Sequence, residues 1–166
     1  MHFTIAAAIA VVAALAEFTV VPHLKVGAAV PHPVLVFGVI WAVAGGLEVG
    51  LTWAFVGGLA LDILGQRPLG TSAFSLLIAI GAASLIGGSM GRVKIAAPVI
   101  ATFIASLIYS MLLLLSTTAL TTAPLSSTAL ESVIPSAVYD TVLAAIVGPL
   151  VMAVVARRRE AERVEW

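Results

Sequence analysis

The chain has 166 residues, of which 61% are hydrophobic and only 10% are Asp, Glu, Lys or Arg. A soluble domain usually carries about a quarter charged residues, so this composition and a mean hydropathy of +1.19 exclude a soluble protein and make lipid the solvent for most of the surface. The zero formal charge gives no sign of a nucleic-acid partner, and the absence of cysteine excludes disulfides, thiolate metal sites and cysteine nucleophiles.

Apolar segments follow one another along the chain and are separated by Pro/Gly clusters and by the few charges. A helix needs roughly 20 apolar residues to cross about 30 Å of hydrocarbon. The first segment has no basic region before it and no polar domain behind it, so we interpret it as a retained membrane helix and not a signal peptide. The sequence therefore predicts an all-α integral membrane protein, a single transmembrane domain with six helices, of which the second is short. The predicted spans are about 3–21, 34–45, 47–64, 71–88, 95–115 and 136–156, followed by a polar tail at 157–166.

Two longer connections and one ambiguous junction separate these spans. The stretch 22–33 contains three prolines and Lys25 and is predicted to be a loop. The stretch 116–135 is rich in Ser and Thr, which predicts a loop with at most a short surface helix. The pair Gly45-Gly46 fits either a tight turn, which separates the second and third spans, or a kink, which merges them.

The distribution of basic residues favours the turn and sets the orientation. Six spans place both termini and the loop after the fourth span on one side, and leave only Lys25 and Arg67 on the other. By the positive-inside rule, both termini are expected in the cytoplasm, whereas merged second and third spans would reverse the N-terminus. Trp41 and Trp53 are candidates for membrane-interface positions. The basic residues on the expected cytoplasmic side are Arg92, Lys94, Arg157, Arg158, Arg159 and Arg163.

Small residues recur at four-residue spacing on four of the predicted spans. Helices in lipid associate by close packing at small residues, so these rows predict the faces that point into the bundle. Three rows also contain an acid. The rows are Ala6, Ala10, Ala13 and Glu17; Gly46, Gly50, Ala54, Gly58 and Asp62; Ser75, Ala79, Ala83, Gly87 and Gly91; and Ser136, Asp140, Ala144 and Gly148.

The three acids are expected to face the bundle interior, toward the outer leaflet. Asp62 ends a helix, where the dipole disfavours negative charge, so it is predicted to need a partner, and Arg67 in the following turn is the nearest one. A charge inside the bilayer costs at least a few kcal/mol, which leaves three interpretations of Glu17, Asp62 and Asp140. They are structural groups that accept backbone N–H bonds or pair with a cation, or they line an outward polar pocket, or they relay protons or ions.

A tight hairpin is predicted between the third and fourth spans. Gly58 allows a neighbouring helix to approach, and Pro68 and Gly70 shape the turn. Thr71 or Ser72 is expected to cap the next helix through its hydroxyl.

Patterns for catalysis or metal binding are weak. His23 and His32 lie in one connection, but no third ligand is within sequence reach. There is no Walker motif, nucleophile elbow, HExxH or Gly-rich nucleotide loop. We therefore predict no enzyme, no metal site and no cofactor.

The stretch GGLALDILGQRPLGTSAFSLL, at positions 57–77, resembles the MreD family of rod shape-determining proteins. That family has Gly-Leu-x-x-Asp at the end of one helix and Pro-Leu-Gly before the next. His32-Pro33-Val34-Leu35 is similar to its entry into the second helix, and Tyr139-Asp140-Thr141 to its final helix, which often reads Tyr-Asn-Thr. The resemblance extends over nearly the whole chain. The matching hairpin positions are Gly58, Leu59, Asp62, Pro68, Leu69 and Gly70.

The resemblance implies a non-catalytic scaffold of the bacterial cell-elongation (rod) complex in the inner membrane, which regulates cell shape and peptidoglycan synthesis. The implied partner is MreC, through its membrane helix and adjacent region, with RodA, penicillin-binding protein 2 and MreB in a larger complex. The implied fold is similar to the substrate-binding subunits of energy-coupling-factor vitamin transporters. That kinship keeps an alternative open, a vitamin-like ligand-binding subunit of a transporter. The residues expected to form the structural motif or an interaction site are Gly58, Asp62, Arg67, Pro68, Gly70, Asp140 and Glu17.

Overall fold

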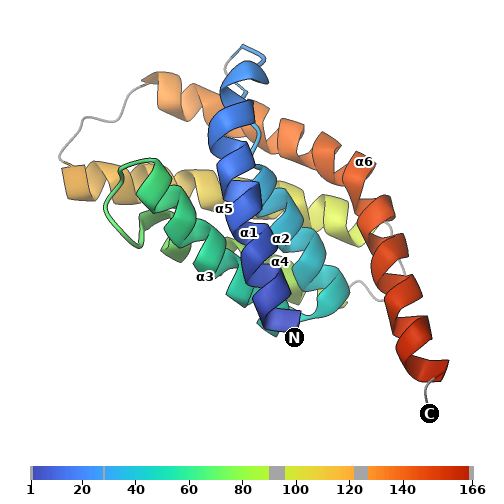
Figure 1. Cartoon of the computed structure of the whole chain (residues 1–166). Helices are drawn as coiled ribbons and strands as arrows, with labels where there is room; N and C mark the ends of the chain where they lie inside the picture. The colour runs from blue at the N-terminus through green and yellow to red at the C-terminus, as the bar shows by residue number, and fades with distance from the viewer. Residues whose placement is uncertain (1, 28, 90–95, 122–126, 165–166) are drawn as a thin grey trace.

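The computed structural model describes residues 2–27, 29–89, 96–121 and 127–164 and is a bundle of six α-helices (Figure 1). Within these ranges there is no β-strand, only an isolated bridge between Val26 and Ala29, so the predicted all-α fold is confirmed. The helices are α1 (His2–Val20), α2 (Pro33–Gly45), α3 (Leu47–Leu64), α4 (Thr71–Ser89), α5 (Ala96–Thr121) and α6 (Ser127–Val164), and a short 3-10 helix, η1, covers Val21–His23.

Five of the six helices are long and apolar enough to cross a membrane. Only 22% to 44% of each spanning window is buried inside the protein, and large apolar side chains point outward, such as Leu85 at 74% and Ile146 at 70% exposure. The remaining helix, α2, has 13 residues and is about 20 Å long at 1.5 Å per residue. Most of its side chains are buried, so α2 is a short central helix that the longer helices surround in a multi-pass membrane protein.

Helices α2 and α3 form an antiparallel hairpin. They meet at Gly46, whose φ of +102° is favourable only for glycine. Gly50 packs against Ala42 and Gly57 packs against Val34, so residues later in α3 contact residues earlier in α2. The turn predicted between the second and third segments is therefore confirmed, and a single merged helix is excluded.

Trp53 holds this hairpin together from the inside. Its side chain is fully buried, and its indole Nε1 donates a hydrogen bond of 2.8 Å to the Val34 carbonyl. The ring centroids of Phe37 and Trp41 lie 6.4 and 6.5 Å from the ring centroid of Trp53. A buried indole needs such a partner for its N–H, and the prediction that Trp53 lies at a membrane interface is wrong.

The prediction of a loop at 116–135 is also wrong for the described residues, because α5 continues to Thr121 and α6 begins at Ser127. Thr117 and Thr118 donate hydrogen bonds of 2.8 Å to the carbonyls four residues earlier in α5. Such bonds satisfy the hydroxyls without leaving the helix, so a stretch rich in Ser and Thr can remain helical in lipid.

Helix α6 is longer than the predicted span and continues through the polar tail to Val164. It contains Pro135 and Pro149, and Figure 1 shows it changing direction in its C-terminal half. Proline inside a helix removes one backbone hydrogen bond and favours a bend. Arg92 and Lys94, which the orientation argument used, lie outside the described residues.

The small-residue rows face the interior as predicted. Gly46 is the exception, because it lies exposed at the α2–α3 junction, and Gly91 lies outside the described residues. Ala13, Glu17 and Gly87 are half-buried. The fully buried members are Ala6 and Ala10 on α1; Gly50, Ala54, Gly58 and Asp62 on α3; Ser75, Ala79 and Ala83 on α4; and Ser136, Asp140, Ala144 and Gly148 on α6.

Consecutive helices run in opposite directions, so the C-terminal ends of some helices lie beside the N-terminal ends of others. In Figure 1, α3 and α5 end at the left, α6 begins at the upper left, and α1 ends at the top. Helix α1 begins and α6 ends toward the opposite side. The three acids of the small-residue rows lie next to the N-termini of α2 and α4.

Candidate functional site

Asp62, in the last turn of α3, caps the N-terminus of α4. Its side chain is fully buried, its Oδ2 accepts a hydrogen bond of 2.8 Å from the Gly70 N–H, and its Oδ1 accepts one of 2.8 Å from the Ser72 N–H. These N–H groups have no partner inside α4, and the positive end of the α4 dipole favours a carboxylate there. The neighbouring helix therefore offsets the unfavourable dipole of α3.

The geometry does not pair Arg67 with Asp62, which corrects the predicted ion pair. The Arg67 backbone N–H donates to the Asp62 carbonyl at 3.0 Å, but its guanidinium donates to the Ser72 hydroxyl at 3.4 Å. Among the described side chains Asp62 and Arg67 form no salt bridge. The predicted cap by a Thr71 or Ser72 hydroxyl is also replaced, because the Thr71 hydroxyl donates to the Pro68 carbonyl and Ser72 contributes its backbone N–H.

The turn between α3 and α4 places these groups. Gly70 has a φ of +96°, a left-handed conformation that costs glycine little, and it directs the Gly70 N–H to Asp62. Gln66 has a φ of +50°. Gly58, one turn before Asp62, lies directly against the backbone of Ala73, so the two helices are close enough for the cap to form.

Two further carboxylates cap the N-terminus of α2. Glu17 on α1 accepts a hydrogen bond of 2.9 Å at Oε2 from the Val34 N–H. Asp140 on α6 accepts one of 2.7 Å at Oδ1 from the His32 N–H. Pro33 has no N–H to donate. The backbone N–H groups of His32 and Val34 thus each have an acidic partner on a different helix.

His32 extends this second cap into a network. Its Nδ1 lies 2.9 Å from Asp140 Oδ2, and the Ser106 hydroxyl donates to the same oxygen at 2.6 Å. The rings of His32 and Tyr109 meet edge to face at 5.3 Å and 76°. From the sequence, His32 was a weak metal-ligand candidate and part of the entry into α2, and Ser106 and Tyr109 were missed. The only sequence signal was the His32-Pro33 entry into α2.

The two capped helix ends belong to one cluster. Tyr109 interacts electrostatically with both Glu17 and Asp62 and contacts the Ser72 hydroxyl. Arg67 interacts electrostatically with Glu17 and with His32. In the described part of the chain, no three His, Asp or Glu side chains form a group that could hold a metal ion. We call this group the capping cluster: Glu17, His32, Asp62, Arg67, Ser106, Tyr109 and Asp140.

The charge of His32 depends on Asp140. His32 lies in the connection before α2, and its side chain is 15% exposed. Burial alone lowers the pKa of His32, but the Asp140 carboxylate, which attracts the positive charge and accepts the Nδ1 hydrogen bond, raises the pKa above its ordinary value of 6.5. Glu17 adds to this rise, and Arg67 opposes it. Protonated His32 is therefore favoured in the folded protein.

This raised pKa predicts a pH dependence of stability. Because folded His32 holds its proton more tightly than unfolded His32, the stabilisation is fully present below about pH 6.5 and is lost as the pH rises through the higher folded pKa. The free energy of unfolding in detergent should therefore fall in the wild type as the pH rises above about 6.5. Asp140→Asn should flatten this fall, because it removes the carboxylate that raises the pKa. An identical pH profile in both proteins would contradict the assignment.

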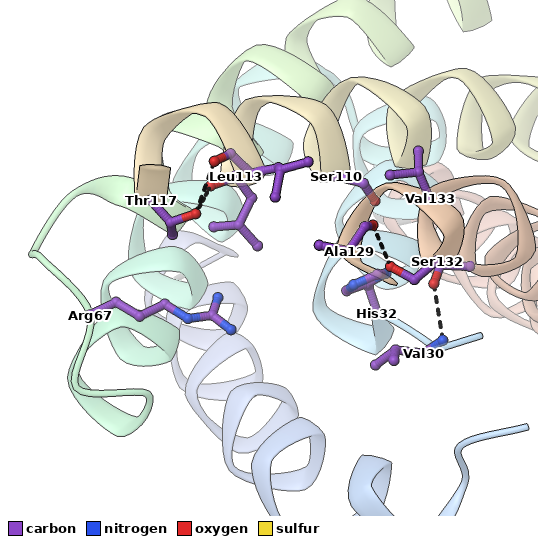
Figure 2. A pocket seen from close by; sticks show the side chains of 11 residues that line it. Val30, His32, Arg67, Ser110, Leu113, Thr117, Ala129, Ser132 and Val133 are labelled. Atoms are coloured by element: carbon purple, nitrogen blue, oxygen red, sulfur yellow. Dashed lines mark hydrogen bonds between the residues drawn. The ribbon is translucent and has the colours of Figure 1, made fainter. Parts of the chain in front are cut away.

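A cavity of about 260 Å³ lies beside the capping cluster (Figure 2). It is bounded by the connection before α2, by Arg67, by the C-terminal half of α5 and by the first turns of α6. Glu17, Asp62 and Asp140 do not line it, so the cavity is beside the acids and not formed by them. The lining residues are Val30, His32, Arg67, Ser110, Leu113, Leu114, Thr117, Ala129, Ser132, Val133 and Ser136.

Comparison with known proteins gives one family match. A family model described as rod shape-determining protein MreD matches residues 1–157. Searches of curated proteins and of solved structures give no match, so the similarity to energy-coupling-factor subunits stays a prediction. Because the family match covers nearly the whole chain, the predicted resemblance to this family is confirmed. The chain belongs to the MreD family, and its role is in rod shape determination.

Proposed function

We propose that this protein is a non-catalytic membrane scaffold that binds MreC and through it regulates peptidoglycan synthesis in the cell-elongation complex. RodA, penicillin-binding protein 2 and MreB would belong to the larger assembly. The observation that carries the proposal is the division of roles between the interior and the surface. The buried acids serve the fold, and the long helices present apolar faces that are free to pack against another membrane helix.

The interior acids support a structural role because their oxygens are used. Asp62 accepts two backbone N–H bonds, Glu17 accepts one, and Asp140 accepts from a backbone N–H, an imidazole and a hydroxyl. A base or nucleophile for catalysis needs a lone pair or proton directed at a substrate. These carboxylates are directed at helix ends, which favours the scaffold over an intramembrane enzyme.

The outer face of α1 is the surface that we assign to the MreC membrane helix. Helix α1 is the least buried of the five long helices, with 22% of its window inside the bundle. Ile5, Ile9 and Val12 are 44%, 41% and 63% exposed along one side, and Ala8 and Ala16 on the same side are also exposed. Small residues beside large apolar ones suit close helix packing in lipid.

We also propose that both termini lie in the cytoplasm. Helix α1 begins and α6 ends toward the same side of the bundle (Figure 1). The basic run Arg157–Arg159 in α6 would then be on the cytoplasmic side, as the positive-inside rule favours. The capping cluster would face the outer leaflet.

The partner assignment can be tested by co-purification. Val12→Trp places a bulky ring on the proposed surface of α1, and Ile146→Trp places the same ring on an α6 position that is 70% exposed. Both variants should insert and fold, because both rings face lipid. The amount of MreC recovered with the tagged protein from native membranes should fall several-fold for Val12→Trp and stay unchanged for Ile146→Trp.

Two outcomes would contradict the proposal. Equal MreC recovery with both variants would remove α1 as the contact surface. Recovery of normal rods after clean deletion of the protein would remove the scaffold role altogether.

A vitamin-like ligand-binding subunit is less well supported. Pockets for drug-sized ligands are typically about 300–1,000 Å³, and the cavity beside the capping cluster, at about 260 Å³, is smaller. The two fully buried acids, Asp62 and Asp140, do not line it, so the polar groups that this alternative relied on are not available to a ligand.

A further inference from the structure

The cavity beside the capping cluster has cationic groups at one part of its wall and apolar groups at another. The charged side chains that line it are His32 and Arg67. Figure 2 shows the Arg67 side chain extending toward the space that His32 and Ser110 border from the other side. The apolar wall comes from α5 and α6, chiefly Leu113, Leu114 and Val133.

Asp140 forms an ion pair with His32, whereas no described carboxylate forms a salt bridge with Arg67, so Arg67 is the uncompensated cation at the cavity surface. Asp62 directs its oxygens at the N-terminus of α4, and Glu17 and Asp140 direct theirs at the N-terminus of α2. Asp140 also forms a hydrogen bond with His32 Nδ1, so the other ring nitrogen, Nε2, is not the one that Asp140 contacts. The Arg67 guanidinium has one long hydrogen bond, of 3.4 Å, to Ser72. Most of its five N–H donors are therefore available to an anion.

Ser110 gives an independent sign that the cavity takes a ligand. Its hydroxyl oxygen is buried and has no hydrogen-bond partner, and the residue lines the cavity. Leaving a buried hydroxyl unpaired costs about 1–3 kcal/mol, so native proteins rarely retain one without a reason. An acceptor atom inside the cavity would satisfy it.

We propose that this cavity binds the anionic headgroup of an amphiphile, a phosphate or carboxylate carried on an apolar chain. Arg67 and His32 hold the anion, and the Ser110 hydroxyl donates to it. The chain leaves along the apolar wall of α5 and α6. On these helices Leu115 and Ile134 are 52% and 66% exposed on the outer surface of the protein, so a lipid tail would continue into the bilayer.

Native mass spectrometry of the full-length protein in non-ionic detergent tests this proposal. Phosphatidylglycerol, phosphatidylcholine and inorganic phosphate are added separately at equal concentration. The phosphatidylglycerol adduct should exceed the phosphatidylcholine adduct several-fold, because the choline cation of phosphatidylcholine is repelled by Arg67 and His32, whereas the phosphatidylglycerol headgroup is a net anion. Inorganic phosphate should neither form a lasting adduct nor displace the lipid. Equal retention of the two lipids would overturn the proposal. Displacement by phosphate at the same concentration would also overturn it, in favour of a soluble anion.

Three variants distinguish lipid binding in the cavity from general attraction of the lipid to surface charge. Arg67→Gln should lower the phosphatidylglycerol adduct by about tenfold, whereas Lys25→Gln, which removes an exposed cation from the connection before α2, should leave it unchanged. Ser110→Ala should lower the adduct several-fold without lowering the melting temperature, because its hydroxyl has no partner to lose. If Arg67→Gln unfolds, Ser110→Ala alone decides. Adduct levels equal to wild type in Ser110→Ala and in any folded Arg67→Gln would refute the site.

Discussion

Asp62→Asn should destabilise the protein by about 2–4 kcal/mol, since it removes one of two hydrogen bonds to a carboxylate and leaves a buried N–H facing another donor. Asp62 is fully buried and gives one oxygen to each of two backbone N–H groups. An asparagine has one oxygen and one NH₂ group. Whichever way its amide is turned, the NH₂ group must face the N–H of Gly70 or of Ser72.

Asp140→Asn is the matched control, because it makes the same chemical change at another fully buried acid. Its oxygen can still accept from the His32 N–H, and its NH₂ group can donate to the Ser106 hydroxyl or to an unprotonated His32 Nδ1, which occupy the other carboxylate oxygen in the wild type. We expect a cost of about 1 kcal/mol, that of one ordinary hydrogen bond.

Unfolding in mixed detergent micelles measures both variants on the same scale. The midpoint for Asp62→Asn should lie well below that for Asp140→Asn at pH 7. If the two midpoints coincide, or if Asp62→Asn unfolds like the wild type, then donation from Gly70 and Ser72 does not explain why an acid is buried at the end of α3.

Gly58→Ala should have a comparable effect through packing alone, about 1–3 kcal/mol or more for a methyl group forced into a filled space. A Cβ at Gly58 would lie 2.3 Å from the Ala73 Cα and 2.6 Å from the Ala73 N. Both are backbone atoms, so the clash can be relieved only by moving α3 away from α4. Such a movement would also lengthen the hydrogen bonds between Asp62 and the α4 N-terminus.

Gly81→Ala provides the control for helix propensity in lipid. Gly81 lies in α4, and nothing lies within 4 Å of a Cβ built there. Alanine is the better helix former by about 1 kcal/mol, so Gly81→Ala should be neutral or slightly stabilising. Thermal melting of both variants in detergent should separate them clearly. A melting temperature for Gly58→Ala at or above that of the wild type would show that α3 and α4 are not in contact at this position.

The helices and their interior faces could be predicted from the sequence because lipid imposes simple rules. Apolar runs of sufficient length must be helices, and small residues at four-residue spacing mark close contacts. These rules placed Gly50, Ala54 and Gly58 on the buried face of α3. They failed at 116–135, because Ser and Thr were taken as loop formers, whereas Thr117 and Thr118 bond to their own helix.

The capping cluster could be predicted only in part. The sequence indicated that Glu17, Asp62 and Asp140 face inward, and it left open the structural role that the hydrogen bonds now support. It could not identify their partners, because these come from distant positions: His32 and Asp140 are 108 residues apart. Arg67 was proposed for Asp62 on sequence proximity, but the backbone N–H groups of α4 take that place.

These contacts suggest why an acid-poor membrane protein retains three carboxylates at one end. Helices α2 and α4 begin inside the bundle, where water cannot satisfy their first N–H groups. Each carboxylate replaces that water and at the same time links two helices: α3 to α4 through Asp62, α1 to α2 through Glu17, and α6 to α2 through Asp140. The caps thereby fix the relative positions of these helices.

Amide hydrogen exchange in detergent, followed by mass spectrometry, tests this role of the acids most directly. In Asp62→Asn, protection should fall at residues 70–74 and remain unchanged at 32–36, while Glu17→Gln should give the reverse pattern. Protection that stays at wild-type levels in both segments, or that falls uniformly along the bundle in both variants, would contradict the conclusion that these carboxylates act as caps for α2 and α4.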